Sequence, residues 1–338
     1  MVDTSLAGGG LAAARPDQRP NAPVGSADRE GSGPVLQIAS AQAARVGGRE
    51  VPSAVARPIA RPGTLRILLR NPAAAVGLAI LFTVAVVALL APLVFPGDPL
   101  DIAGPALLRP GTNAAFPFGT DSLGRNVAAG LAHGARITLT IGLAAAGLGL
   151  LIGVLVGSVA GYFGGRLDDL LVKLTEIFQT VPPFVLMIVL VAIFQPTVPT
   201  IITAIGIVSW PGVARVVRAE FRSLRNKDFV VAARGLGFGH RRIIFREILP
   251  NALPPIIVTA SVMVAGAILA ESAMSFLGLS DANAVSWGSM IGMGREQIRT
   301  AWYLTAIPGI AIVLTVLALN LIGDGLNDAL NPRLSRSR

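Results

Sequence analysis

The chain has 338 residues, of which 53% are hydrophobic and only 14% are charged, whereas soluble domains carry about 25% charged residues. This balance excludes an ordinary soluble protein. The net charge of +9 could suggest a nucleic-acid binder, but aromatic residues make up only 5% of the chain and supply no stacking surface. The chain has no cysteine, so it forms no disulfide and no thiolate metal site. We therefore expect a membrane protein that binds no nucleic acid.

Residues 1–65 differ in composition from the rest. Gly, Ala, Pro, Ser and scattered Arg dominate, and no apolar run follows the first methionine as it would in a signal peptide. We predict a disordered cytoplasmic leader, for which a misassigned start codon is the alternative explanation.

Six apolar segments follow, each long enough for a membrane-spanning helix of about 20 residues. They lie at about 73–95, 137–163, 174–194, 198–217, 253–279 and 303–323. The prediction is an all-α, polytopic membrane domain over residues 66–333, with a short tail at 334–338. Six spans place both chain ends on the same side of the bilayer.

The basic residues orient these spans. With the N-terminus inside the cell, 23 of the 28 Lys and Arg residues are cytoplasmic. Cytoplasmic loops of membrane proteins carry such an excess of Lys and Arg. We therefore expect both termini in the cytoplasm of a bacterial cell, with five arginines outside: Arg109, Arg125, Arg136, Arg295 and Arg299.

The spans are rich in small residues and prolines. Glycines recur at four-residue steps in the second span, where they allow close helix packing: Gly149, Gly153, Gly157 and Gly161. Prolines are expected to break or bend the later spans, at Pro182 and Pro183, Pro211, Pro254 and Pro255, and Pro308. Bent helices around a cavity are typical of transporters.

The sequence predicts no catalytic residue, metal site or cofactor. Neither lysine, Lys173 or Lys227, follows a glycine as a nucleotide-binding Walker A loop requires. The two histidines, His133 and His240, have no carboxylates at metal-ligand spacing, and we expect them at the surface or the interface. Any ATP hydrolysis would take place in separate subunits.

Two carboxylates fall within predicted spans, where ionised groups are expensive and tend to face the bundle interior or a water-filled path. These are Glu271, which adjoins Ser272 and Ser275, and Glu176 near the start of the third span. Packing or gating is the expected role of Glu271, Ser275 and Glu176. Proton relay is the alternative.

The cytoplasmic segment 218–250 is long and basic. We predict a first short helix with Asp228 as N-cap and Gly235 or Gly237 as stop, and a second one, HRRIIFREIL, that ends at Pro250. The segment either lies on the membrane or docks into a groove of another protein, and its small alanines favour the groove. Docking would use Phe229, Val230, Val231 and Ala233, while cations including Arg234 meet anionic partners.

This segment resembles the EAA loop of importer permeases of the ATP-binding cassette (ABC) superfamily. Ala232 and Ala233 match the two alanines, Gly237 the glycine, and Leu249 with Pro250 the closing pair. Val231 stands where the family has glutamate. In that family the loop forms a coupling helix held in a cleft of the ATPase subunit. Gly237→Asp and Ala233→Glu are therefore predicted to abolish ATP-driven uptake without preventing membrane insertion.

The resemblance extends over about residues 66–333. Over this range the chain is similar to the second permease of dipeptide, oligopeptide and nickel importers. It implies the type I ABC importer permease fold, a heterodimer with a homologous permease, two ATPase subunits and an extracytoplasmic solute-binding protein, all at the bacterial cytoplasmic membrane. The matching segments are FGTDSLGRN, HGARITLTIG, GYFGGRLDDLLVKLTEIF, AARGLG, REILPN, ILAESAMSFLGL, SWGSM and NLIGDGLNDALNPR.

Two questions stay open in the sequence. Peptides are the expected substrate, with nickel chelates, glutathione or other small solutes as alternatives. A proton-driven carrier is a second class, but it would show an inverted repeat, whereas these spans are unlike one another.

Overall fold

The computed structural model describes residues 68–330, and within this range it is built from helices joined by loops. The predicted leader and tail lie outside the described residues. Five helices are long and apolar enough to cross a membrane: α3 (Pro72–Val94), α4 (Val127–Phe163), α7 (Val198–Leu224), α10 (Leu249–Phe276) and α12 (Tyr303–Leu330). This confirms the all-α, multi-span prediction.

The third predicted span, 174–194, is not one continuous helix. It consists of α5 (Gly165–Thr180) and α6 (Pro183–Phe194), which meet at an angle of 78°. The cause is the Pro182–Pro183 pair, because neither residue has a backbone N–H and Val181, before the first proline, is held extended at φ −89° and ψ 131°. If the bent pair is one span, the chain has six.

The other prolines within spans do not break their helices. Pro211 lies inside α7, Pro254 and Pro255 inside α10, and Pro308 inside α12, and each helix continues past them. Of the two predicted effects, a break or a bend, a break does not occur at these positions.

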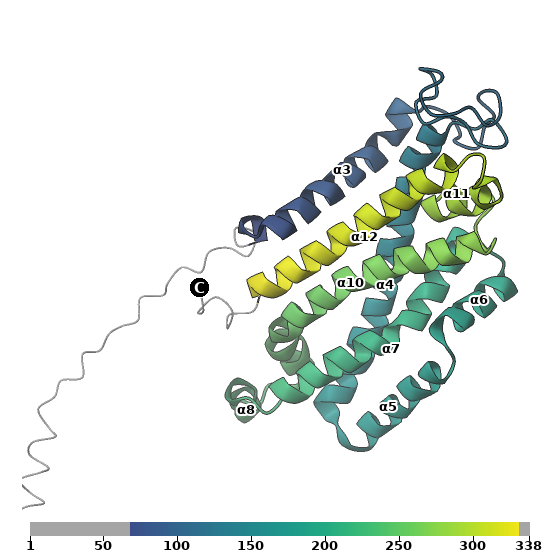
Figure 1. The fold of residues 1–338 in the computed structure, drawn as a ribbon. Helices are drawn as coiled ribbons and strands as arrows, with labels where there is room; N and C mark the ends of the chain where they lie inside the picture. The colour runs from purple at the N-terminus through teal and green to yellow at the C-terminus, as the bar shows by residue number, and fades with distance from the viewer. Residues whose placement is uncertain (1–67, 331–338) are drawn as a thin grey trace, which may run out of the picture. The chain divides into compact units, whose positions relative to one another are not determined.

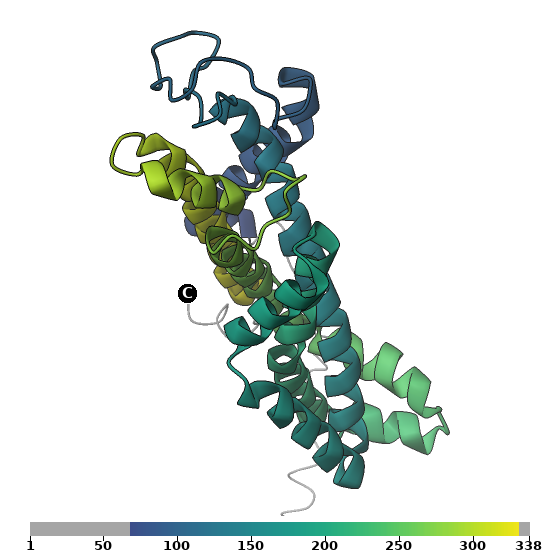
Figure 2. The ribbon, with the colours of Figure 1, turned by 90° about the vertical axis from the view of Figure 1, so that its right-hand side faces the viewer.

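Helix α4 is the centre of the bundle and packs most extensively on α7 (Figures 1 and 2). The glycine stripe explains this packing. A methyl group added at Gly157 would lie 2.5 Å from the Ala214 carbonyl oxygen, and one at Gly161 would lie 2.6 Å from the Phe221 Cβ. Only glycine lets the two backbones approach so closely.

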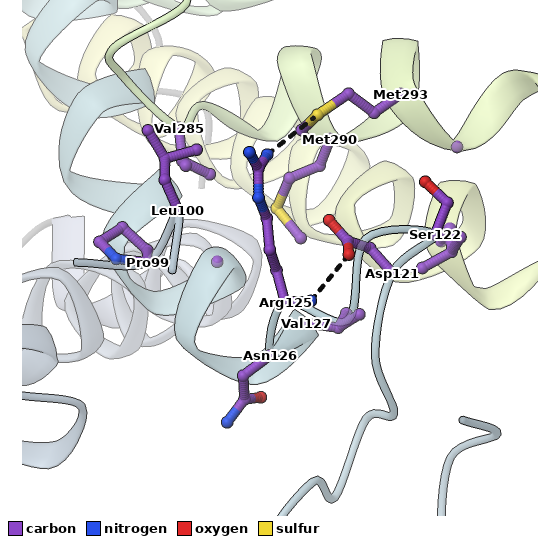
Figure 3. Close-up of a pocket in the computed structure, with 13 residues that line it drawn as sticks. Pro99, Leu100, Asp121, Ser122, Arg125, Asn126, Val127, Val285, Met290 and Met293 are labelled. Carbon is purple, nitrogen blue, oxygen red and sulfur yellow. Dashed lines mark hydrogen bonds between the residues drawn. The ribbon is translucent and has the colours of Figure 1, made fainter. Parts of the chain in front are cut away.

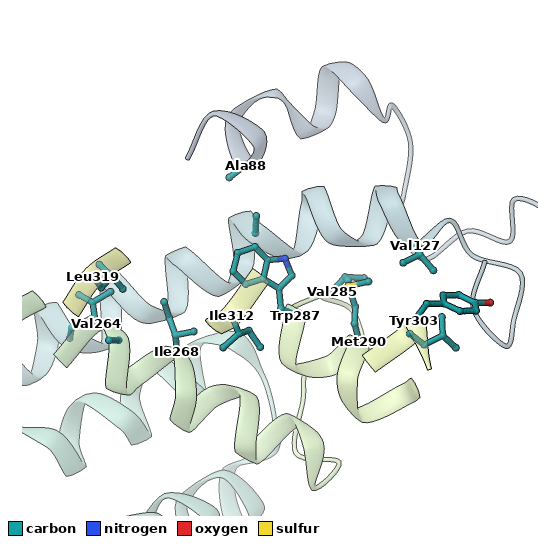
Figure 4. Close-up of a cluster of buried hydrophobic side chains, with 14 of the residues drawn as sticks. Ala88, Val127, Val264, Ile268, Val285, Trp287, Met290, Tyr303, Ile312 and Leu319 are labelled. Atoms are coloured by element: carbon teal, nitrogen blue, oxygen red, sulfur yellow. The ribbon is translucent and has the colours of Figure 1, made fainter. Parts of the chain in front are cut away.

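Of the remaining long helices, α10 packs against α12, and α12 packs against α3. A cluster of buried side chains joins α4, α10 and α12 around Trp287, the first residue of the short helix α11 (Trp287–Gly294) (Figure 4). Helices α8 (Asp228–Gly235) and α11 lie at opposite ends of the bundle (Figure 1). These ends hold the two candidate sites.

Candidate coupling segment and buried carboxylate

Helix α8 is the first short helix predicted in segment 218–250. Lys227 is its N-cap, so the prediction that Asp228 caps it was wrong. Asp228 is the first helical residue, where its negative charge interacts favourably with the positive end of the helix dipole. The helix ends at Gly235. The N–H of Gly237 then donates to the Arg234 carbonyl at 2.9 Å with Gly237 at φ +77°, a conformation that favours glycine.

One face of α8 is buried in its own chain. Val230 and Ala233 pack into a cluster with Phe221 at the end of α7 and with Ile243 and Ile248. Val230 and Ala233 are therefore not available for the groove of another protein, and the prediction that these two residues dock was wrong. Their burial follows from the rotation of α8 on the bundle, which the sequence pattern does not fix.

The opposite face of α8 is exposed. It carries Phe229, Val231, Ala232 and, just beyond the helix, Leu236, whose side chain is 73% exposed. These four residues form a small exposed apolar patch, one helix long. We call these four residues the α8 docking face.

The segment is fastened to the end of α4. The Tyr162 hydroxyl and His240 Nδ1 are 2.9 Å apart, and Arg225 donates to the Gly161 carbonyl at 3.2 Å. The guanidinium of Arg234, which is exposed, lies 5.6 Å from the centre of the Tyr162 ring. These contacts connect α8, the start of α9 and the end of α7 to the end of α4.

The second predicted short helix is not separate. The chain runs from α9 (His240–Arg242) through a π-helical turn, η1 (Ile243–Ile248), directly into α10. Leu249 is half-buried and Pro250 is exposed, both directly after the π-helical turn. The segment that links α7 to α10 is accordingly shorter than predicted: α7 extends to Leu224, and the helix that continues into α10 begins at His240.

A buried ion pair near this end was not predicted. Arg218 on α7 donates from Nη2 to the Asp168 Oδ2 on α5 at 2.8 Å and from Nε to Oδ1, which makes a bidentate pair. Asp168 is buried. The sequence signal for this pair was a cation-rich segment together with two adjacent acids, Asp168 and Asp169. Which of these residues pair depends on how α5 and α7 pack.

Glu271 is the second candidate site, and its side chain is only 1% exposed. Its Oε1 accepts hydrogen bonds from Ser275 at 2.8 Å and from Ser286 at 2.5 Å, and Ser272 lies 3.4 Å from Oε2. Three hydroxyls therefore satisfy the carboxyl group in a place where an unpaired one would be costly. Ser286 comes from the loop before α11, and no sequence pattern linked it to Glu271.

Ser286 also caps α11 by accepting from the Ser289 N–H at 3.0 Å. The next residue, Trp287, donates from its backbone N–H to Thr138 at 3.1 Å and from its ring to the Leu131 carbonyl at 2.8 Å. The short helix is in this way attached to both α10 and α4. The hydrogen bond from Ser286 to Glu271 holds the N-terminal end of α11.

Glu176 does not belong to this cluster. It is exposed on α5 and lines a separate recess between α4, α5 and α7, together with Gln179 and Arg215. Among the described residues no group of three His, Asp or Glu side chains could hold a metal ion. His133 is half-buried rather than at the surface and its Nε2 lies 3.0 Å from the Phe95 carbonyl oxygen, while His240 is exposed.

Family models match two parts of the chain. Residues 153–336 match "Binding-protein-dependent transport system inner membrane component", and residues 63–110 match "N-terminal TM domain of oligopeptide transport permease C". The first match covers more than half of the chain. The chain belongs to the family of binding-protein-dependent ABC importer permeases.

Known relatives match this chain over most of their own length. The permease is 39% identical over 273 residues to the di/tripeptide transport system permease protein DppC of Pseudomonas aeruginosa, covering 79% of this chain and 90% of that protein. It is 38% identical over 270 residues to the oligopeptide transport system permease protein OppC of Haemophilus influenzae, covering 79% and 87%.

A solved structure supports the fold. An inward-facing structure of the MetNI methionine ABC transporter matches with a TM-score of 0.50 and 19% identity, covering 60% of this chain and 96% of that chain. The permease thus has the fold of ABC importer permeases, and the predicted family is confirmed.

Proposed function

We propose that this permease pairs with a second, homologous permease and with two ATPase subunits, and that the assembly imports di- or oligopeptides delivered by an extracytoplasmic solute-binding protein. The names of its relatives support peptides as the substrate. The arginine bias supports a multi-pass position in the bacterial cytoplasmic membrane with both termini cytoplasmic.

The coupling proposal rests on one observation, the division of α8 into two faces. Val230 and Ala233 fasten the helix to its own chain, while the α8 docking face is left uncovered. An ATPase subunit that holds this face and moves on closing would displace the ends of α4, α7 and α10 together. ATP binding can then bias two packings that differ by a few kcal/mol.

The remaining predicted site residues have supporting roles in this proposal. Arg234 and Asp228 are exposed charges next to the docking face, and Gly237 ends the helix. Leu249 and Pro250 begin α10, through which the motion enters the membrane. Glu271, which also accepts from Ser275, accepts from Ser286 at the start of α11, and Glu176 lines a recess beside α5.

The test is uptake of trialanine into proteoliposomes that contain the complete complex and its solute-binding protein. We expect ATP-dependent uptake, and a more than about tenfold loss for Ala232→Glu, because a carboxylate on the docking face would be desolvated without a partner. Ser223→Glu puts the same charge on an exposed position at the end of α7 and serves as the control.

Uptake of nickel chelate or glutathione but not of trialanine would overturn the peptide assignment and leave the coupling proposal intact. Normal uptake by Ala232→Glu would overturn the coupling proposal. ATP-independent uptake driven by a proton gradient would contradict both.

A further inference from the structure

The connection between α3 and α4, residues 95–126, is folded tightly at the α11 end of the bundle. Asp121 Oδ1 accepts from the backbone N–H groups of Leu123 at 2.9 Å and of Arg125 at 2.8 Å. The Tyr303 hydroxyl lies 2.8 Å from the carbonyl oxygens of both Leu108 and Thr120, which fastens the connection to α12. The backbone of Arg125 is therefore held in a defined position.

The side chain of Arg125 enters a recess between this connection and α11 (Figure 3). The recess is narrow, with a cavity volume of about 30 Å³, and Met290 and Met293 form its far wall. The guanidinium Nη1 reaches the Met293 sulfur at 3.7 Å, and a thioether is only a weak acceptor. The far wall is apolar, whereas Asp121 and Ser122 also line the recess, and the Asp121 carboxylate forms no ion pair with Arg125.

Arg125 has no acidic partner among residues 68–330. The ion pairs found there involve Arg218 and Arg222 instead. The Nε of Arg125 is buried and has no hydrogen-bond partner in the described part of the chain. A buried donor without an acceptor is destabilising, and a carboxylate meets a guanidinium with two parallel hydrogen bonds.

The recess lies beyond the hydrocarbon layer. Helix α4 has 37 residues and is about 55 Å long, whereas the hydrocarbon core is about 30 Å thick. Arg125 precedes this helix, and the apolar run begins only at Ile137, about 16 Å further along the helix axis. A ligand of Arg125 therefore arrives from the aqueous side, which is the extracytoplasmic side in the orientation proposed above.

The surroundings of Arg125 have the composition of a protein interface. Ile102, Leu123 and Met293 are large, exposed apolar residues on the same two segments. Arginine and methionine next to exposed apolar side chains are enriched at such interfaces. We propose that this recess receives an acidic side chain of the solute-binding protein, with Arg125 as the residue that pairs with it. The inference rests on the proposed function, which supplies that partner.

The experiment measures association between the complete complex in nanodiscs and the solute-binding protein that sustains its uptake. For Arg125→Gln we expect association weaker by about tenfold or more, mainly through faster dissociation, because a desolvated pair is lost. Arg109→Gln removes the same charge from an exposed site of the same connection. It should change only the association rate and its salt dependence.

A second variant keeps the proposal testable if Arg125→Gln misfolds. Because the chain has no cysteine, Ser122→Cys, at the edge of the recess, can be cross-linked to cysteines that replace single acidic residues of the solute-binding protein. We expect one such position to form a disulfide.

Three results would overturn the inference. The first is wild-type association of a folded Arg125→Gln complex. The second is unchanged association with a lost preference for trialanine over its C-terminal amide, which would assign the recess to the substrate carboxylate. The third is separation of the two permeases, which would assign it to their contact. Absence of any uptake by the wild type would instead refute the proposed function.

Discussion

At the scale of single residues, burial separates positions that look equivalent in the sequence. Ala232 and Ala233 are adjacent and both match the family pattern, yet Ala232 is exposed and Ala233 is buried against the chain's own core. Composition and spacing identified the pair. Its division into a docking and an anchoring residue depends on contacts made by residues far away in sequence, such as Phe221 and Ile248.

The first prediction separates these two alanines. Ala233→Glu should lower the thermal stability of the purified permease, because the carboxylate would be buried without a partner. Ala232→Glu should leave the stability unchanged and affect only uptake. Thermal unfolding of both variants in detergent checks this, and equal melting temperatures for the two would contradict the assignment of the faces.

The second prediction concerns Glu271. Glu271→Ala should destabilise the permease by about 2–4 kcal/mol, since it leaves a cavity and removes the acceptor of buried hydroxyls. Glu271→Gln keeps an oxygen that can accept from Ser275 and Ser286, so it should be much milder. Thermal unfolding is again the measurement. A Gln variant as unstable as the Ala variant would show that the negative charge itself is needed.

At the scale of elements, the sequence predicted the existence of the helices better than their ends. The apolar runs located five long helices and a bent pair. Helix α4 starts ten residues before its predicted span, at Val127, because Asn126 caps it outside the apolar run. Prolines were predicted to break or bend the helices at four places, and a break occurs at one, Pro182–Pro183.

The third prediction tests the packing of α4 on α7. Gly157→Val should prevent assembly of the stable permease, because the added atoms would overlap the backbone at Ala214. Gly147→Val is the matched control, as no atom lies within 4 Å of a methyl group added there. The yield of monodisperse protein in detergent measures the effect. Equal yields would show that the two helices do not approach as closely as described.

The fourth prediction tests the end of α8. Gly237→Ala should destabilise the permease by about 1 kcal/mol, because Gly237 has φ +77° and alanine tolerates this conformation poorly. Gly235→Ala, inside the helix and also in open space, should be neutral or slightly stabilising. Denaturant titration compares them. The reverse order of stabilities would mean that the helix ends elsewhere.

At the scale of the whole molecule, family membership and the distribution of basic residues indicate the fold and the orientation in the membrane. Family membership supplies the permease fold, and the cation count supplies the orientation proposed here. The partners of Glu271 and Arg125 could not be predicted, because Ser286 and Met293 come close to them only through the placement of α11.

The fifth prediction tests the orientation. In intact cells a membrane-impermeant maleimide should label Ser122→Cys, which is exposed before α4, and should label Lys227→Cys, exposed before α8, only after permeabilisation. The absence of native cysteines in this chain makes each label unambiguous. The opposite pattern would invert the topology.

The central claim is that the α8 docking face lies against an ATPase subunit. Its most direct test is cross-linking of single cysteines on α8 to the ATPase subunit in the assembled complex. Ala232→Cys should form the cross-link, Val230→Cys on the buried face should not, and the cross-link should stop uptake until it is reduced. Failure of every exposed α8 position to reach the ATPase, with uptake intact, would contradict the account.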